Sequence, residues 1–332
     1  MKKTNKYLST TLLTVALLLG ACNAKEEVAE KDNVEVANKE VVNTEVVTIE
    51  NEGMTITFEE APKKAISINQ HVTEVMLALG LEDSMVGTAY LDDVIYEPLQ
   101  AAYKEVPVLA EQYPSKEQII STEADFIYGG WASAFNEKNV ASREELQGLD
   151  IDTYLQSSSV KVAPTLEDVQ KDITNIAAIF RVEERGKALI EEMNEDIKAI
   201  QTKIPENTDP LNVLVFDSGE TDVFTATQNF MNTLITMAGG KNVFGDIEDN
   251  WATVSKEDAV ERGADVVVVI DYGQTTAEEK IAFLKADPAL SQIPAVQNDR
   301  FVVLPLSAAS EGVRVAEALE ILVNGFYPEA TN

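Results

Sequence analysis

Two stretches of the chain decide its fold class: SKEQIISTEADFIYG at residues 115–129 and SKEDAVERGADVVVV at residues 255–269. In both, a Ser that can cap a helix is followed ten residues later by an Asp that opens an apolar run. Gln118 and Asp258 stand where they can close a capping box. Each stretch therefore predicts a short helix that leads into a buried strand, and the repetition indicates a duplicated architecture.

The same alternation of strands and helices extends outward from both stretches. Strands are expected at residues 65–68, 212–216 and 300–304, a hairpin at 48–58, and helices at 71–79, 230–237 and about 312–324. Strands that alternate with helices form parallel sheets covered on both faces. The sequence thus predicts an α/β fold with two Rossmann-like lobes whose sheets are rich in parallel strands.

One long helix is expected to join the lobes. Residues 183–205 form an amphipathic segment that ends at Pro205, and the second series of strands and helices begins directly after it. We therefore predict an N-terminal lobe at 47–182, an interlobe helix at 183–205 and a C-terminal lobe at 206–330. A cleft between two lobes is a usual place for a small ligand.

The first residues have the pattern of a targeting segment. A basic start with Lys2, Lys3 and Lys6 precedes a short apolar run at residues 11–19 and the sequence Leu-Gly-Ala-Cys ending at Cys22. We interpret residues 1–21 as a signal peptide and residues 22–46 as an acidic tether. The end of the leader resembles the lipobox of bacterial lipoproteins, which implies lipidation of Cys22, with palmitate, and anchoring at the outer face of the cytoplasmic membrane.

The composition excludes several classes of function. Lys and Arg number 26 against 57 Asp and Glu, and the net charge of −31 opposes nucleic-acid binding. The single Cys cannot form an intramolecular disulfide, and the single His rules out metal sites with several imidazoles. A secreted hydrolase using Asp92, Asp93 or Asp249 is a remote alternative, because these residues belong to acidic stretches that solvation explains.

Four segments, taken in order behind the leader, resemble one family of proteins. Residues 65–87, 114–128, 251–268 and 295–305 are similar to segments of the substrate-binding lipoproteins of ABC importers for iron–siderophore complexes, haem and cobalamin. This is the class with a single rigid helix between the lobes. The resemblance extends over about residues 55–328.

The resemblance implies a transport role without enzymatic activity and without a cofactor. The protein is expected to be a monomer that captures an iron complex for iron uptake, a ferric siderophore first, and delivers it to a permease dimer with its own ATPase. Haem or a corrinoid in the same role is the alternative. By motif match, Glu117 and Glu257 are expected to dock on the permease, although each also suits the positive end of a helix dipole.

Family ligands lie between the lobes, against loops at strand ends. Candidate ligand-binding residues on such loops are Gln70, His71, Tyr90, Trp131, Trp251, Tyr272 and Arg314. Either Trp could cover a flat chelate or pack within its own lobe. His71 could bind haem iron or only form a hydrogen bond, and Arg314 could meet an anion or pair with a local acid. Because the chain holds only six Arg and no basic cluster, highly anionic triscatecholate complexes are disfavoured, whereas neutral or cationic hydroxamates, corrinoids and haem stay open.

Overall fold

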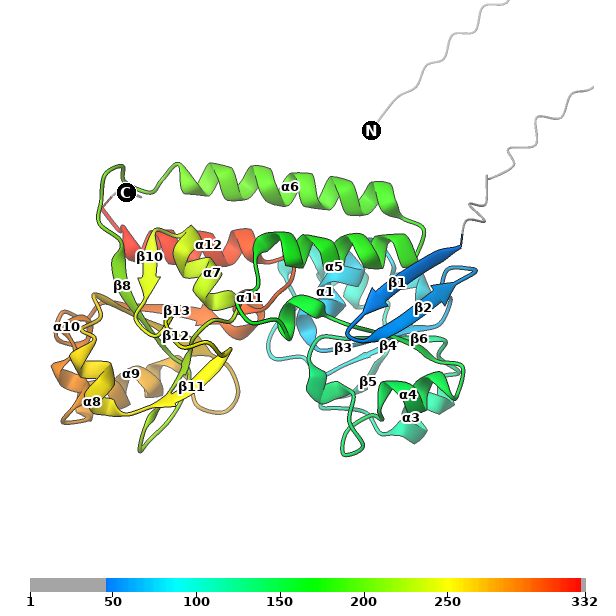
Figure 1. Cartoon of the computed structure of the whole chain (residues 1–332), viewed down its shortest axis with the longest axis horizontal. Coiled ribbons are helices and arrows are strands. Elements are labelled where there is room, and N and C mark those ends of the chain that lie inside the picture. Colours follow the sequence, from blue (N-terminus) through cyan, green and yellow to red (C-terminus); the bar gives the residue numbers. More distant parts are fainter. Residues whose placement is uncertain (1–45, 330–332) are drawn as a thin grey trace, which may run out of the picture. The chain divides into compact units, whose positions relative to one another are not determined.

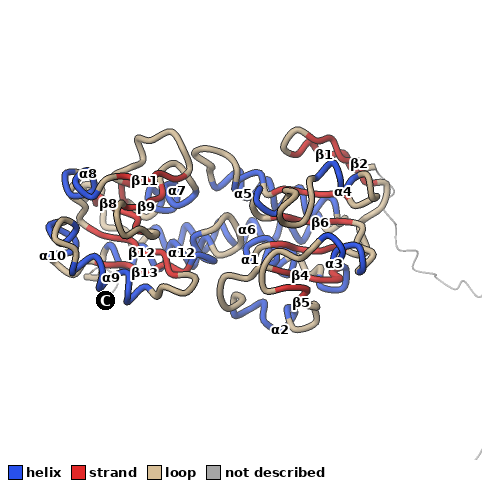
Figure 2. Tube along the Cα trace, turned by 90° about the horizontal axis from the view of Figure 1, so that it is seen from below, coloured by secondary structure: helices blue, strands red, loops and turns tan. Residues whose placement is uncertain are grey.

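The computed structural model describes residues 46–329, so the predicted signal peptide, the lipidated Cys22 and nearly all of the tether lie outside the described residues. Within 46–329, no helix has the length and apolar character needed to cross a bilayer. The described residues belong to one compact unit. Its strands gather in two separate groups, which form the two lobes (Figure 2).

The N-terminal lobe contains a five-stranded parallel sheet in the order β5-β4-β3-β6-β7 and a separate antiparallel hairpin, β1–β2. Its strands are β1 (Val47–Asn51), β2 (Met54–Phe58), β3 (Ala65–Ile68), β4 (Met85–Ala89), β5 (Val108–Ala110), β6 (Phe126–Gly129) and β7 (Asp152–Leu155). Its helices are α1 (Gln70–Ala78), α2 (Gln100–Tyr103), α3 (Lys116–Ser121), α4 (Arg143–Gln147) and α5 (Leu166–Ile179).

The C-terminal lobe contains a four-stranded parallel sheet in the order β10-β8-β12-β13 and an antiparallel pair, β9–β11. Its strands are β8 (Leu211–Phe216), β9 (Val223–Ala226), β10 (Gly240–Asn242), β11 (Trp251–Val254), β12 (Val266–Asp271) and β13 (Phe301–Pro305). Its helices are α7 (Phe230–Met237), α8 (Lys256–Glu261), α9 (Ala277–Ala286), α10 (Pro294–Gln297), α11 (Leu306–Ala309) and α12 (Val315–Phe326).

Strand β12 shows why a parallel sheet needs cover on both faces. Its residues 266–270 are fully buried. Val266, Val268 and Ile270 enter one apolar cluster, whereas Val267 and Val269 enter another. Because successive side chains point to opposite faces of a strand, an unbroken apolar run supplies two cores at once.

The two repeated stretches fold as the sequence predicts. The Ser115 hydroxyl accepts a hydrogen bond from the backbone N–H of Gln118, and the Gln118 side chain closes a capping box on the Ser115 N–H. The Ser255 hydroxyl accepts a hydrogen bond from the Asp258 N–H in the same way, but Asp258 does not close the expected capping box, because its carboxylate pairs with Arg262. The helices that follow these caps lead into β6 and β12, which are central strands of their sheets. The expected α/β class with two lobes is therefore confirmed.

Helix α6 (Glu183–Gln201) stands between the two series of strands in the chain. Its 19 residues extend for about 28 Å. It packs against α5 of the N-terminal lobe and α12 of the C-terminal lobe, which lie along one side of it (Figure 1). The helix ends four residues before Pro205, the end that the sequence suggested. The boundaries at 182 and 205 stay a prediction, since the described residues belong to one compact unit.

Gly186 gives α6 its close approach to α5. A Cβ atom added at Gly186 would lie 2.5 Å from Cβ of Ala177, which is far inside normal contact distance. Replacing Gly186 with Ala should therefore lower the free energy of unfolding by about 1–3 kcal/mol through overpacking, although Ala normally favours a helix. Urea denaturation measures this change.

The variant Ala177→Gly/Gly186→Ala is the matched control, because it removes the methyl group that the new Cβ would meet. In this double-mutant cycle, Gly186→Ala should cost less when position 177 is Gly. An equal cost in both backgrounds would show that the α5–α6 contact does not depend on Gly186.

Candidate functional site

Three loops of the N-terminal lobe leave the sheet at the carboxyl ends of β3, β4 and β6. Asn69 follows β3 with a φ of 88°, and Tyr90 follows β4 with a φ of 60°. Such left-handed backbone is costly for residues other than Gly and often marks functional sites. The Asn69 side chain accepts a hydrogen bond from the Trp131 N–H after β6 at 3.2 Å, so the loops after β3 and β6 are tied together.

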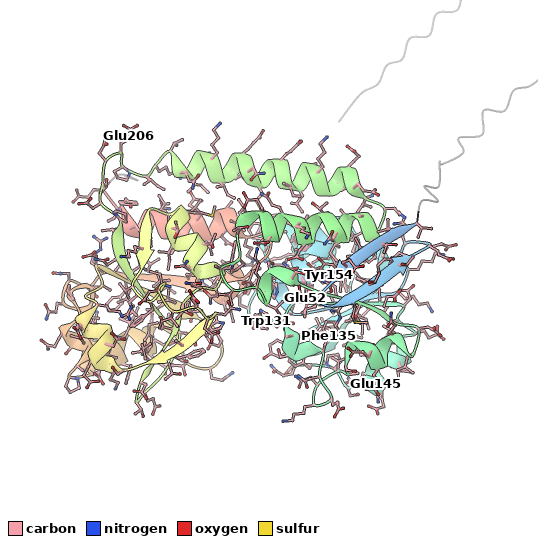
Figure 3. The ribbon with its side chains drawn as sticks, viewed as in Figure 1. Glu52, Trp131, Phe135, Glu145, Tyr154 and Glu206 are labelled. Carbon is pink, nitrogen blue, oxygen red and sulfur yellow. The ribbon has the colours of Figure 1, made fainter. Side chains whose placement is uncertain are left out.

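Aromatic rings cover these loops. The Tyr90 and Tyr113 ring centroids lie 4.5 Å apart, and Tyr90 meets Trp131 edge-on at 6.3 Å. The His71 ring lies 5.2 Å from Trp131. Trp131 is only partly buried. The N-terminal lobe thus presents a supported aromatic side chain to the space between the lobes (Figure 3 labels Trp131 there).

His71 lies beneath this aromatic surface and is buried. Neither of its ring nitrogens has a hydrogen-bond partner of normal geometry among the described residues. Burial lowers its pKa to about 4, with the Gly130 backbone opposing the shift, so the ring is neutral near pH 7. A Cβ at Gly130 would lie 2.5 Å from Nε2 of His71, which shows how closely the ring is enclosed.

The C-terminal lobe contributes aromatic residues at its own strand ends. The Trp251 ring in β11 stacks on Phe224 of β9, with centroids 5.3 Å apart. Tyr272 follows β12, and its hydroxyl donates a hydrogen bond to Asp217 at 2.8 Å. Burial, together with the nearby Asp217 carboxylate, raises the pKa of Tyr272, so the phenol keeps its proton and acts as a donor.

A buried ion pair joins the lobes. Arg314, in the loop before α12, donates from Nε to Oε2 of Glu74 in α1 at 2.8 Å and from Nη2 to the second carboxylate oxygen of Glu74. Nη2 also donates to the Val94 carbonyl at 2.7 Å. Glu74 is fully buried and Arg314 is 6% exposed. A two-point Arg–carboxylate pair of this kind is strong and directional.

Gln70 and Asp93 extend this network. Gln70 Oε1 accepts hydrogen bonds from the backbone N–H groups of Asp92 and Asp93, and its Nε2 donates to the Asp93 carboxylate at 3.0 Å. Ser307, in the C-terminal lobe, donates to the same carboxylate at 2.6 Å. Burial and the charges of Asp93 and Glu74 raise the pKa of Asp92 to about 7. Asp93 therefore belongs to the contact between the lobes, and Asp92 precedes it on the same loop.

A cavity of about 190 Å³ has residues of both lobes in its wall. Its aromatic and apolar lining consists of Trp131, Phe230, Met231, Trp251, Ile270, Leu306 and Ala309, and its polar lining consists of Ser159, Asn229, Asn250, Ser310 and Glu311. No Lys, Arg or His is among these described residues. The wall is therefore suited to a ligand that is apolar on its faces and carries no negative charge facing it.

The candidate residues from the sequence divide into three groups. Trp131 and Trp251 line the cavity from opposite lobes. Tyr90 and Tyr272 lie at strand ends against protein partners, and His71 lies inside the N-terminal lobe. Gln70 and Arg314 belong to the interlobe network, so the guanidinium already has a carboxylate partner.

Most of the polar residues that line the cavity were not predicted from the sequence. Asn229 accepts a hydrogen bond from the Met231 N–H as the cap of α7, and a cap before an apolar helix is a signal that was available. Asn250 and Glu311 had no such signal, because they lie in irregular segments. Only the packing of the lobes brings Glu311 to Ser159, 152 residues away.

The two predicted docking residues occupy equivalent places. Glu117 and Glu257 are each the second residue of a short helix, α3 and α8, and both are exposed. Among the described residues, neither forms a hydrogen bond or an ion pair. Their neighbours Lys116 and Lys256 pair instead with Glu145 and Asp287. Both carboxylates are therefore available on the surface.

Comparison with known proteins shows that the chain matches one protein family. Residues 66–308 match the model of the family described as periplasmic binding protein. The chain is similar over 99% of its length to an uncharacterized ABC transporter substrate-binding lipoprotein of Bacillus subtilis, YvrC, with 27% identity and 99% of that protein covered. It is also similar to a vitamin B12-binding protein of Pectobacterium carotovorum, with 24% identity over 63% of this chain and 71% of that protein.

Among solved structures, the fold is similar to that of a periplasmic binding protein from Veillonella parvula. The TM-score is 0.79 and the sequence identity is 29%, with 85% of this chain and 98% of that chain covered. The likeness therefore includes both lobes and the helix between them.

The interlobe ion pair yields a stability prediction. Replacing Arg314 with Met leaves the Glu74 carboxylate buried without its cation, which should lower the free energy of unfolding by about 3–5 kcal/mol. The double variant Glu74→Gln/Arg314→Met should regain much of this loss, since the fully buried side chain at position 74 is then uncharged, while Asp93 and Glu317, the other carboxylates within 4.0 Å of Arg314, are more exposed. Urea denaturation at pH 7 measures both changes.

Arg185→Met is the matched control, because Arg185 donates to the carbonyls of Leu79 and Gly80 and is exposed. It should cost far less than Arg314→Met. A double variant no more stable than Arg314→Met would contradict the ion-pair explanation.

Proposed function

The chain belongs to the periplasmic binding protein family, and from this we propose that it captures a neutral or cationic metal complex between its lobes as the substrate-binding protein of an ABC importer. The family is a solute-binding component of transport, so the protein is not an enzyme. The choice of ligand rests on the lining of the cavity. Its wall contains two Trp, one carboxyl and no cationic side chain among the described residues.

The charge of the ligand distinguishes between the ligand classes that the family resemblance left open. Anionic ligands are usually held by Arg or Lys, and the cavity wall contains neither. Arg314 is already paired with Glu74. Triscatecholate complexes and haem, with its carboxylates, would meet the Glu311 carboxyl without a compensating cation. Corrinoids and ferric hydroxamates, which carry no such charge, are favoured.

A corrinoid is our first candidate. Its large ring offers faces that Trp131 and Trp251 can contact from the two lobes. The similarity to a protein named as vitamin B12-binding supports the same choice. A ferric siderophore, the first expectation from the sequence, stays the second candidate in its hydroxamate form, since a wall without cationic side chains suits it equally well.

The size of the cavity sets a condition on binding. About 190 Å³ is below the roughly 300–1,000 Å³ of sites that enclose drug-sized ligands. A metal complex therefore either lies partly outside this cavity or separates the lobes as it enters. Separation would require breaking the Ser307–Asp93 and Arg314–Glu74 contacts, so we expect the ligand to lie mainly at the mouth.

Fluorescence titration of residues 46–332 tests the ligand class. Cyanocobalamin should quench Trp emission with a dissociation constant below about 1 µM, because Trp131 and Trp251 would lie against it. A ferric trihydroxamate is the second probe, and haem and a ferric triscatecholate are the anionic comparisons. Tightest binding of either anionic complex would contradict the charge argument. No saturation by any probe, with the protein folded by circular dichroism, would contradict the proposed function.

We also propose that a lipid on Cys22 holds the protein at the outer face of the cytoplasmic membrane. The support is the sequence pattern that ends at Cys22 and the similarity, over nearly the whole chain, to a protein named as a lipoprotein. A lipid anchor would keep the binding lobes near the permease, which raises the effective concentration of the ligand-loaded protein there.

Docking on the permease is proposed to use Glu117 and Glu257. Replacing both with Ala should abolish ligand uptake by cells, because two exposed carboxylates that dock on cationic partners would be lost. Ligand affinity should be unchanged, since neither residue lines the cavity. Uptake of labelled ligand and fluorescence titration measure the two effects.

The chain offers a matched control pair. Glu144 and Glu278 are also exposed and also stand second in their helices, after the caps Ser142 and Thr276. Replacing both with Ala removes the same charge and the same favourable contact with a helix dipole. Uptake should persist in this control; its loss there, or its persistence in the Glu117/Glu257 variant, would overturn the docking assignment.

A further inference from the structure

Glu311 lies at the point where the two lobes meet in the cavity wall. It follows α11 in the C-terminal lobe and is 8% exposed. Its backbone carbonyl accepts a hydrogen bond from Nε2 of Gln156 at 2.8 Å, and its Oε2 accepts one from Oγ of Ser159 at 3.2 Å. Both partners belong to the N-terminal lobe. The carboxyl group is therefore held in place from across the cleft.

The environment of Glu311 differs from that of the other buried glutamate at the lobe contact. Glu74 has a two-point ion pair with Arg314. Glu311 forms no ion pair within the described residues, and its donors are its own backbone N–H and the Ser159 hydroxyl. Burial raises its pKa to about 7, with the Asp172 charge adding to the shift. A buried carboxyl with so few partners is costly unless something else supplies donors.

The contact between the lobes does not require this side chain. Gln156 binds the backbone carbonyl of Glu311, a bond that any residue at position 311 would accept. The Ser159 bond, at 3.2 Å, is longer than the 2.5–3.0 Å typical of O–H···O bonds. The remaining feature of Glu311 is that it lines the same cavity as Trp131, Trp251, Asn229 and Asn250.

We propose that Glu311 is a ligand-binding and specificity residue whose carboxylate accepts hydrogen bonds from an ammonium or amide group at the edge of the metal complex. The inference rests on the proposed function and names the chemistry by which the cavity selects its ligand. The Trp rings contact the apolar faces of the complex, and Glu311 supplies its directional polar contact. A ligand with a carboxylate at that edge is rejected, because two like charges would be buried together.

Isothermal titration calorimetry on the full-length chain tests this assignment with matched probes. Cyanocobalamin carries peripheral amides, and its monocarboxylic acids carry a carboxylate in place of one of them. At least one of these acids should bind the unaltered protein about tenfold or more weakly than cyanocobalamin. In Glu311→Gln this discrimination should shrink to about threefold or less, because the repelling charge is gone.

A second probe pair serves if the ligand is a hydroxamate. Ferrioxamine B carries an ammonium group, and its N-acetyl derivative has the same ferric centre without that charge. Glu311→Gln should weaken binding of the ammonium form about tenfold and leave the acetylated form within about twofold. Asp249→Asn, which removes an exposed charge beside cavity-lining Asn250, is the control and should leave both preferences intact.

The possible outcomes distinguish a failure of the Glu311 assignment from a failure of the proposed function. Equal weakening of all probes by Glu311→Gln, or no change in any preference, would overturn the assignment of Glu311 and leave the proposed function standing. Absence of binding by every probe to the unaltered protein would overturn both. A thermal-unfolding midpoint no lower in Glu311→Gln than in the unaltered chain would confirm that lost affinity does not come from unfolding.

Discussion

The ion pair between Glu74 and Arg314 is the contact on which the relation of the lobes depends most. Each partner is buried, and each would be strongly destabilising without the other. Because Glu74 belongs to α1 and Arg314 precedes α12, the pair can form only when the lobes stand at one separation. The cavity draws its wall from both lobes, so its shape depends on the same contact.

The parallel sheets explain why the chemistry gathers at this place. In a parallel sheet the loops at one edge all follow carboxyl ends of strands, and ligands of α/β proteins bind there. Asn69, Tyr90 and Trp131 follow three strands of one lobe, while Asp217 and Tyr272 follow two strands of the other. The two buried glutamates differ in their partners. Glu74 forms an ion pair with Arg314, whereas Glu311 forms no ion pair within the described residues.

Local patterns predicted much of the fold. The helix caps at Ser115 and Ser255 form, and the apolar runs at β3 and β12 become central strands. The pair β9–β11 was not expected, because its short strands carry mixed side chains and are identified only by pairing with each other. Trp251 lies in β11, a strand that the sequence analysis did not predict.

The sequence by itself determined the α/β class, the two lobes and the helix between them, because periodicity and capping act over a few residues. The family was indicated by the resemblance of four segments to known binding proteins and not by these local patterns. The sequence also determined that cations are scarce, since composition needs no structure. Only the tertiary structure decided that Trp131 and Trp251 share a cavity, that Arg314 is neutralised by Glu74, and that Glu311 is not neutralised. These outcomes depend on contacts between residues more than a hundred positions apart, whose free energies are set by burial and not by any local pattern.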